Sequence, residues 1–497
     1  GTEPALRLRQ ELGLRCPVVL FAAGTMSKGA DTLLFHWQPL LRPGDGLWFS
    51  SEADRAIWRR VVRRSALHEW VVPLGVDETL FRPRAPAERR AVREAHGLPP
   101  TAPLLLSVGR LNIQKNLHTL LRLLAAVRRE VADAHLCFVG EEDGIGLHEF
   151  GVLNTGYVAW LRGQAAELGL ADAVTFTGPL FGEDLAALYA AADVVVSASV
   201  NQRENGGLAQ AEAQACGVPV VCSAWGGFKD VVRDGETGFL MEAVLIRHGI
   251  RVDWATGAAQ VVALLHNPAL RAAMGERAVA WARERYGLAA FGQALGRIAD
   301  EVGTPPPGGE SAGASGATGR AVSRAGRAQG SGTDQGTSDG GPSDVPFEPS
   351  AFAAPFEAHK RARGWYDPIV VARRGGYPPL FQGRVYRFYE RLMVPYATRR
   401  ASALGASQPA PEWVPYFPSP VVLDPVRQVA EDHDPIWPHR RFCRPDVWAV
   451  LRQVDGVASV ESIVTAVTAE RPAVDRRAVG AILRELHVEG FILFKRK

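Results

Sequence analysis

Apolar runs of strand length alternate with stretches of helical periodicity through the middle of the chain. The runs are residues 102–109, 134–140, 173–178, 193–199 and 219–224. Because most of these runs are apolar throughout rather than at every second position, they are typical of strands buried on both faces of a sheet. Strands that alternate with helices in this way predict a doubly wound α/β domain that closes near residue 300.

The first 90 residues show a shorter version of the same alternation. Apolar runs at residues 16–23, 46–50 and 69–73 are separated by polar or arginine-rich stretches such as residues 52–64. They predict parallel strands joined by crossover helices. The pattern starts part-way through a unit, since residues 6–14 read as the end of a helix, and we therefore expect further residues upstream.

The amino-acid composition of the chain changes after residue 302. Residues 303–347 consist mainly of small and polar residues with few large apolar side chains, which predicts a disordered linker that cannot bury enough surface to fold. Residues 348–442 are rich in proline and aromatic residues, and one helix is expected over residues 381–404. Regular periodicity resumes over residues 443–497 and predicts a small separate domain.

Three short helices and a terminal β segment are expected in this last domain. The helices cover residues 445–454, 460–468 and 475–489, and the β segment covers residues 490–494. This order is typical of a winged helix. The acidic residues in and near 475–489 offset its arginines, so the sequence argues against nucleic acid as a partner.

Composition and charge limit the number of domains and the kinds of site to expect, but they indicate no particular partner. At 497 residues the chain exceeds what one hydrophobic core serves, and two or three domains are expected. A net charge of +3 is uninformative, and the five cysteines lack the spacing of a metal site, so we predict no metal and reduced thiols inside a cell. The longest apolar runs are shorter than a membrane span. We therefore expect a cytoplasmic protein, with attachment to the inner face of the membrane as the alternative.

Two glutamates around a glycine pair give the strongest chemical signal. Glu204 precedes Gly206 and Gly207, and Glu212 lies inside the helix that these glycines open. The N-terminus of that helix offers backbone N–H groups and a positive dipole end, and glycine lets a ligand approach the backbone, so the pattern suits a diphosphate. The alternative is a structural pair, with one glutamate as a helix cap and the other in solvent.

Two cations in one loop give the second signal. Arg110 and Lys115 follow Gly109, at the carboxyl end of the domain's first strand, where open α/β sheets bind ligands. Cleavage of a sugar from a nucleoside diphosphate leaves negative charge, which a guanidinium and an ammonium would stabilise. The alternative is a pair of surface charges.

Together these motifs resemble the donor site of family 4 glycosyltransferases. The resemblance rests on E-x7-E before a helix that ends in Ala-Cys-Gly-Val-Pro, and on Gly-Arg-x-x-x-x-Lys-Asn at residues 109–116. Further matches occur in the family's order and cover about residues 70–300. They are residues 72–81, 138–140, 174–178, 185–193, 226–232, 234–239 and 278–286.

The resemblance implies a GT-B fold, with residues 1–90 as a partial acceptor-side Rossmann-like domain and residues 91–302 as the donor domain. It also implies a retaining transfer on one face of the sugar, without a protein nucleophile, a metal or another cofactor. The implied roles are Arg110 and Lys115 on the diphosphate, Glu204 on the sugar, Glu212 on the ribose, and Gly109, Gly206, Gly207 and Leu208 around the phosphate or sugar.

The chain departs from the family at its N-terminal end. The first strand and the glycine-rich loop that should precede Val18 are absent, and the histidine that often follows the strand at 16–23 is replaced by a different sequence. Thr25, Ser27 or Lys28 could face the cleft in its place. His36 and His68 are isolated, and we assign neither a catalytic role.

Two further predictions concern the C-terminal extension, the second from a resemblance. Residues 359–400 combine many arginines with aromatic residues, which predicts an arm wrapped around the catalytic domain, with an anionic membrane or nucleic acid as the alternative surface. Residues 443–497 resemble the PqqD-like domains that bind leader peptides, which implies a peptide or protein partner.

The sequence therefore predicts a glycosyltransferase that moves a sugar from a nucleotide-sugar donor to a glycan, lipid-linked or small-molecule acceptor. One rival is a GT-B hydrolase or epimerase that shares the nucleotide site. Another is a non-catalytic, GT-B-derived scaffold that binds a peptide or protein through its C-terminal winged-helix domain.

Overall fold

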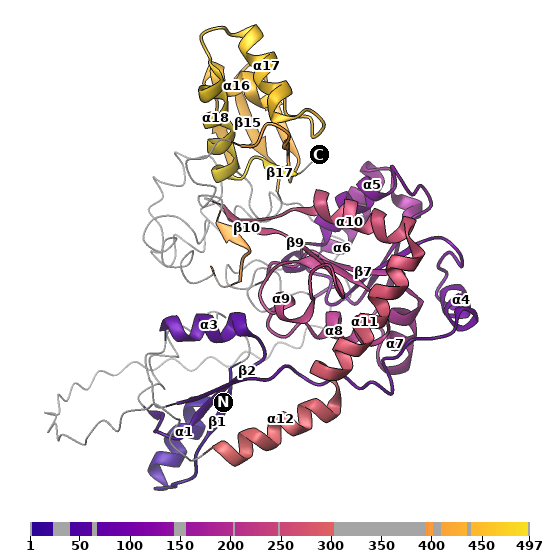
Figure 1. The fold of residues 1–497 in the computed structure, drawn as a ribbon, viewed down its shortest axis with the longest axis vertical. Helices are drawn as coiled ribbons and strands as arrows, with labels where there is room; N and C mark the ends of the chain where they lie inside the picture. Colours follow the sequence, from indigo (N-terminus) through magenta and orange to yellow (C-terminus); the bar gives the residue numbers. More distant parts are fainter. Residues whose placement is uncertain are drawn as a thin grey trace, which may run out of the picture.

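The computed structural model describes residues 2–22, 40–61, 67–143, 156–201, 204–246, 249–302, 394, 396–400, 409–434 and 439–495. These residues form a small N-terminal part, a central α/β domain and a C-terminal module (Figure 1). The predicted linker, most of the predicted arm, and Thr25, Ser27, Lys28 and His36 lie outside the described residues.

The central domain is built on a six-stranded parallel sheet. Its strand order is β6-β5-β4-β7-β8-β9. The bounds are β4 (Leu104–Val108), β5 (His135–Val139), β6 (Val174–Gly178), β7 (Val194–Ser197), β8 (Val220–Ser223) and β9 (Gly238–Met241). The five strands predicted from apolar runs are confirmed. The order reverses between β4 and β7, so the carboxyl ends of these two strands form the place where doubly wound sheets bind ligands.

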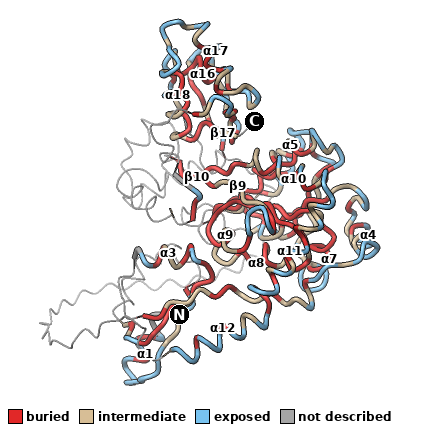
Figure 2. Tube along the Cα trace, viewed as in Figure 1, coloured by how far each residue is buried: buried red, intermediate tan, exposed pale blue. Residues whose placement is uncertain are grey.

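Helices cover both faces of this sheet (Figure 1). They are α4 (Pro86–Ala95), α5 (Leu117–Val127), α6 (Tyr157–Glu167), α7 (Gly182–Ala191), α8 (Leu208–Ala215), α9 (Phe228–Val231), α10 (Trp254–His266) and α11 (Pro268–Tyr286). Leu105 belongs to one apolar cluster, whereas Leu104 and Leu106 belong to the other. This alternation explains why the strands are apolar throughout, because neighbouring side chains enter cores on opposite faces. Figure 2 shows the buried sheet between helices whose outer faces are exposed.

The N-terminal part is a three-stranded parallel sheet of order β1-β2-β3. It contains α1 (Thr2–Glu11), β1 (Val19–Phe21), β2 (Gly46–Phe49), α3 (Glu52–Val61) and β3 (His68–Val71). Arg9 of α1 forms a buried ion pair of 2.6 Å with Asp45 at the start of β2. This pair fixes the helix to the sheet, and the predicted parallel strands are confirmed.

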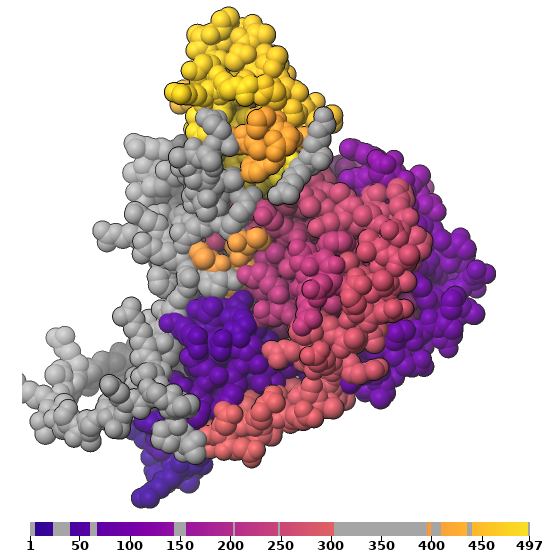
Figure 3. Space-filling model, in the orientation of Figure 1, coloured from indigo at the N-terminus to yellow at the C-terminus, as the bar shows by residue number. Residues whose placement is uncertain are grey.

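The helix after the central domain returns to the N-terminal sheet. α12 (Leu288–Glu301) packs Ala294 and Ile298 against Val72. The indole N–H of Trp70 donates a hydrogen bond of 2.9 Å to Glu301. Figure 3 shows α12, in coral, along the lower edge of the molecule beside the N-terminal part. The two parallel sheets are therefore joined at both ends of the central domain.

The C-terminal module combines three helices with short strands. The helices are α16 (Pro445–Leu451), α17 (Val460–Glu470) and α18 (Arg476–Glu489), as predicted. β13 (Val414–Tyr416) pairs with β17 (Leu493–Lys495), and a second antiparallel sheet has the order β14-β15-β16. The bounds of its strands are Val421–Asp424, Val429–Asp432 and His439–Phe442.

The prediction of a basic aromatic arm over residues 348–442 is wrong for its last part. Ala430, Trp413 and Leu423 pack into the same core as α16, α17 and α18. The aromatic and apolar side chains of this stretch belong to short strands that complete the module. Its boundary was missed because proline-rich strands of three or four residues give almost no periodic signal.

The prediction of a helix over residues 381–404 is wrong at its described end. Arg399–Arg400 form strand β12, which pairs in parallel with β10 (Ala243–Ile246). On its other side β10 pairs with β11 (Gly249–Val252). β12 forms hydrogen bonds with the backbone of β10 on the edge that does not pair with β11. This long-range pairing overrides the local helix propensity of the segment.

The C-terminal module is attached to the central domain by buried polar contacts. Arg251 of β11 forms ion pairs of 2.7 Å with Asp432 and 3.3 Å with Asp434. The Tyr416 hydroxyl donates a hydrogen bond of 2.6 Å to Asp253. These groups are almost completely buried, so the module shares an interior with the domain that it contacts.

Candidate active site

A cavity of about 200 Å³ lies at the carboxyl ends of β4 and β7. It contains six of the eight predicted site residues, namely Gly109, Arg110, Lys115, Glu204, Gly207 and Leu208. Ser107, Val108, Leu111, Leu117, Ser197, Ala209, Gln210 and Phe228 complete its lining. The structure therefore brings the two predicted motifs together, because both follow strands that are adjacent at the reversal of strand order.

Each of the two cations at the cavity faces a carboxylate. Lys115 Nζ lies 2.5 Å from Glu204 Oε1, and their side chains are 23% and 12% exposed. Arg110 Nη1 lies 2.5 Å from Asp143 Oδ2, and Arg110 is 48% exposed. Both cations thus remain accessible from the cavity, and both are oriented by a partner.

The loop that carries the two cations is held by close backbone packing. Gly140 has φ +144°, and a Cβ atom added there would lie 2.0 Å from the carbonyl oxygen of Gly109. Asn112 accepts a hydrogen bond of 3.2 Å from the backbone N–H of Lys115. Asn116, at φ 56°, donates 3.1 Å to the carbonyl of Ala198 beyond β7. The Gly-Arg-x-x-x-x-Lys-Asn spacing therefore fixes the loop between two strand ends.

The loop before α8 holds Glu204 in place. Ser199 donates a hydrogen bond of 2.6 Å to the Glu204 carboxylate, which already accepts from Lys115. The Glu204 carbonyl accepts a bond of 3.1 Å from the N–H of Gly227. The position of Glu204 is thus fixed through both its side chain and its backbone.

The N-terminus of α8 points into the cavity. Gly207 precedes the helix with φ +60°, and no side chain of the described residues caps it. A Cβ atom at Gly207 would lie 2.7 Å from Val231 Cγ2, so a larger residue would disturb the contact with α9. An uncapped N-terminus with a glycine in front of it can bind an anion through backbone N–H groups.

Two predicted residues do not line the cavity. Gly206 faces the N-terminal part, where an added Cβ atom would lie 3.4 Å from Ser50 Cβ. Glu212 lies one turn inside α8, and burial raises the pKa of its carboxyl to about 7, an effect that Tyr189 opposes. The expected separation of Glu204 on a loop and Glu212 in the helix agrees with the structure.

The sequence reasoning missed Asp143 and Ser199. Asp143 follows β5, the neighbour of β4, so it lies on the same edge of the sheet as Arg110. A carboxylate just after a parallel strand could have been considered from this position alone. Ser199 follows β7, and only the fold brings it to Glu204.

The other candidates lie elsewhere. His68 is buried, stacks on Trp70 with 5.1 Å between the ring centroids, and does not line the cavity. Within the described part of the chain, no group of His, Cys, Asp or Glu is arranged to hold a metal ion. No helix among the described residues has the length and apolar character needed to cross a membrane.

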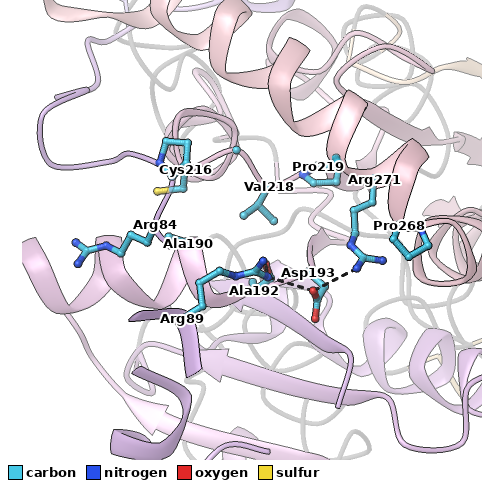
Figure 4. A pocket seen from close by; sticks show the side chains of 13 residues that line it. Arg84, Arg89, Ala190, Ala192, Asp193, Cys216, Val218, Pro219, Pro268 and Arg271 are labelled. Atoms are coloured by element: carbon cyan, nitrogen blue, oxygen red, sulfur yellow. Dashed lines mark hydrogen bonds and ion pairs between the residues drawn. The ribbon is translucent and has the colours of Figure 1, made fainter. Parts of the chain in front are cut away.

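A second cavity of about 220 Å³ lies at the opposite edge of the sheet (Figure 4). Arg89 and Arg271 point toward Asp193 there, at 3.1 Å and 3.8 Å, and Arg93 binds the other oxygen of Asp193 at 2.8 Å. The Asp193 carboxylate also accepts 2.9 Å from the N–H of Leu104. This network ties α4 and α11 to the start of β7, and we interpret it as structural.

The architecture and the cavity define a class of protein. Two parallel sheets face each other, a last helix returns to the first sheet, and a cavity lies at the reversal of strand order of the second sheet. This is the GT-B glycosyltransferase fold. HepE from Anabaena in complex with UDP has the same fold, with a TM-score of 0.51 and 23% identity, over 60% of this chain and 77% of that one.

The central domain is similar to a known family. Residues 88–281 match the family model of glycosyl transferases group 1. The D-inositol 3-phosphate glycosyltransferase of Stackebrandtia nassauensis is 39% identical over 196 residues, which cover 39% of this chain and 40% of that protein. The enzyme of the same name from Actinosynnema mirum is 37% identical over 244 residues, or 47% and 53%. The chain thus spans about half the length of the curated relatives that it matches.

Proposed function

We propose that this chain transfers a sugar from a nucleoside diphosphate sugar to a hydroxyl group of an acceptor. The observation that carries the proposal is the convergence of Arg110, Lys115 and the N-terminus of α8 on one cavity. Three sources of positive potential around about 200 Å³ suit a diphosphate better than a neutral ligand. The glycosyltransferase names of the relatives support the same class of reaction.

The roles of the side chains follow from their positions. As the bond from the sugar to the diphosphate breaks, negative charge develops on the leaving oxygen, and Arg110, Lys115 and the first N–H groups of α8 would stabilise it. Glu204 would accept hydrogen bonds from the hydroxyls of the sugar. Glu212 would hydrogen-bond the ribose hydroxyls, although it is not among the residues that line the cavity.

The geometry favours retention over inversion. Among the described lining residues, Glu204 carries the carboxylate, and Lys115 and Ser199 already hold the same oxygen at 2.5 Å and 2.6 Å. A carboxylate held in this way is suited to orient the sugar, rather than to deprotonate the acceptor as inversion requires or to attack the sugar as a nucleophile. The leaving phosphate would then take the proton of the acceptor hydroxyl on the same face of the sugar.

The assembled cavity also weighs against the scaffold, whereas only the acceptor dependence of the reaction distinguishes the hydrolase or epimerase. A scaffold has no need of two cations kept accessible by carboxylate partners. A hydrolase or epimerase would share the nucleotide site but would not depend on an acceptor. A peptide partner at the C-terminal module and a winged-helix role for it stay predictions, since the family match ends at residue 281.

The test is release of nucleoside diphosphate from UDP-, GDP- and ADP-sugars, with and without candidate acceptors. Inositol phosphate is the first acceptor to try, because the relatives are named for it. We expect acceptor-dependent release from one donor, together with a product in which the anomeric configuration is retained. A rate of nucleoside diphosphate release that is the same with and without each acceptor would favour the hydrolase. Absence of release from all donors would favour the scaffold.

A further inference from the structure

The structure places one tyrosine of the C-terminal extension between the two sheets. Tyr396 has no exposed surface. It directly precedes a segment anchored to the central domain, since Thr398 donates 2.9 Å to the carbonyl of Ala243 and Arg399 pairs with Val244 in β10. Its position is therefore fixed by strand pairing.

Tyr396 supports the turn on which the Glu204 loop rests. Its carbonyl accepts a hydrogen bond of 3.0 Å from Gly226, and its ring lies 5.5 Å from the ring of Trp225. A Cβ atom added to Gly226 would lie 2.7 Å from the Tyr396 ring and 2.4 Å from the Glu204 carbonyl. The Tyr396 ring therefore packs against Gly226, and Gly226 in turn packs against the backbone of Glu204.

The same turn holds both ends of the Glu204 loop. The Trp225 indole donates 2.8 Å to the carbonyl of Asn201, and Gly227 donates 3.1 Å to the carbonyl of Glu204. Displacement of Trp225 or Gly226 would therefore move the loop that carries Glu204. Among the described residues of the extension, Tyr396 packs against this turn through its ring.

Tyr396 also reaches the other sheet. Its hydroxyl donates a hydrogen bond to Asp54 of α3, which has no exposed surface. Ser50, at the end of β2, donates 3.5 Å to the same carboxylate and lies against Gly206 of the donor loop. The backbone N–H of Glu52 donates 2.6 Å to Asp230 of α9. Tyr396 thus contacts both α3 of the N-terminal part and the turn at Trp225 and Gly226 of the central domain, next to the donor cavity.

We propose that Tyr396 is a positioning residue of the donor site, which fixes the Glu204 loop from behind and couples it to α3. This inference rests on the proposed function. It assigns part of the C-terminal extension to the nucleotide-binding machinery, although the extension lies beyond the part of the chain that matches the family. A residue that only filled the interface would contribute to stability and leave nucleotide affinity unchanged.

The experiment is calorimetric titration of the full chain with the nucleoside diphosphate that binds the wild type, using three variants. Tyr396→Ala removes the ring behind Gly226 and should weaken binding about tenfold. Tyr396→Phe keeps the ring and loses only the hydroxyl that reaches Asp54, so it should weaken binding less than Tyr396→Ala, by no more than about threefold. Tyr416→Ala is the matched control for Tyr396→Ala, because it truncates another buried tyrosine of the same extension, whose hydroxyl donates 2.6 Å to Asp253 away from the cavity.

The titration separates a positioning role from a loss of folding. Partial unfolding lowers the number of binding sites per chain, whereas a displaced loop raises the Kd of the folded molecules. Unchanged Kd in Tyr396→Ala, with binding by the wild type intact, would overturn this inference alone. An equal rise of the Kd in Tyr416→Ala would also overturn it. Absence of nucleotide binding by the wild type would overturn the proposed function and this inference with it.

Discussion

At the scale of single residues, the donor site depends on the pair of Lys115 and Glu204. The two groups are mostly buried and lie 2.5 Å apart, so each is the partner that keeps the other in position. Removal of one charge from a buried pair leaves the other uncompensated, which costs more than the pair contributes. The effect of a substitution here therefore includes reorientation of the remaining partner.

Lys115→Ala should reduce the rate of donor cleavage by about 100-fold or more, because it removes one of the groups that stabilise the leaving diphosphate. The measurement is nucleotide release at saturating donor. Arg129→Ala is the control, since Arg129 is exposed near the end of α5 and does not line the cavity. A Lys115→Ala rate within threefold of the wild type would remove Lys115 from the proposed mechanism.

Asp54 should make stability depend on pH. Burial raises the pKa of its carboxyl from 3.8 to about 7, while hydrogen bonds from Tyr396, Ser51 and Ser50 oppose this and the charge of Asp230 adds to it. Between these values the folded state holds a proton that the unfolded state has lost, so this group's contribution to stability falls as pH rises from about 4 to about 7. Asp54→Asn has no such proton.

The measurement is the melting temperature of the wild type and of Asp54→Asn between pH 4.5 and 8. We expect a smaller decrease with rising pH in the variant. Glu212, whose pKa burial also raises to about 7, contributes in the same direction in both proteins and cancels in the comparison. Parallel curves for the two proteins would show that Asp54 titrates as an ordinary carboxyl.

At the scale of elements, the ends of β4 and β5 approach so closely that only glycine fits between them. Gly140→Ala would place a Cβ atom 2.0 Å from the Gly109 carbonyl, at φ +144°. We expect a loss of roughly 2 kcal/mol or more in the free energy of unfolding, together with weaker donor binding. Chemical denaturation and nucleotide titration measure the two effects.

Gly178→Ala is the matched control for this prediction. Gly178 ends the neighbouring strand β6 at φ +79°, and an added Cβ atom would meet nothing within 4 Å. Gly178→Ala should therefore show the backbone strain without the steric clash. We expect it to lower the free energy of unfolding by about 1 kcal/mol and to leave donor binding unchanged. Equal losses in the two variants would contradict the role of the close approach.

The elements also show what the sequence could and could not predict. The central strands were predictable because strands buried on both faces are apolar throughout, and the two donor motifs were placed by the strands that precede them. The partnership of Arg110 with Asp143 and the pairing of β10 with β12 were missed. Both join residues that are distant in sequence, and neither leaves a local periodic pattern.

At the scale of the whole molecule, the chain is held together by interfaces that contain buried charge. The Arg251 side chain is only 2% exposed, and it faces Asp432 and Asp434 of the C-terminal module. The module was predicted as a small separate domain over residues 443–497. Its strands at 414–442 and its buried contacts with β11 could not be read from a sequence pattern, because tertiary packing alone creates them.

Arg251→Ala should release the C-terminal module from the central domain, since it leaves two buried carboxylates without their cation. The expected loss is about 3–5 kcal/mol. Limited proteolysis should then cut the chain between the two parts. Arg452→Ala is the control, because its pair with Glu470 is 44% and 42% exposed and should contribute about 1 kcal/mol or less. A module that stays attached in Arg251→Ala would contradict this account of the interface.

The central claim is that the cavity between β4 and α8 binds a nucleoside diphosphate. Its most direct test is calorimetric titration of the wild type and of Arg110→Ala with UDP, GDP and ADP. We predict that one of the three nucleotides binds the wild type with one site per chain, and that Arg110→Ala weakens this binding at least about tenfold. Binding of none of the three, or equal binding by the variant, would contradict the assignment of this cavity as the donor site.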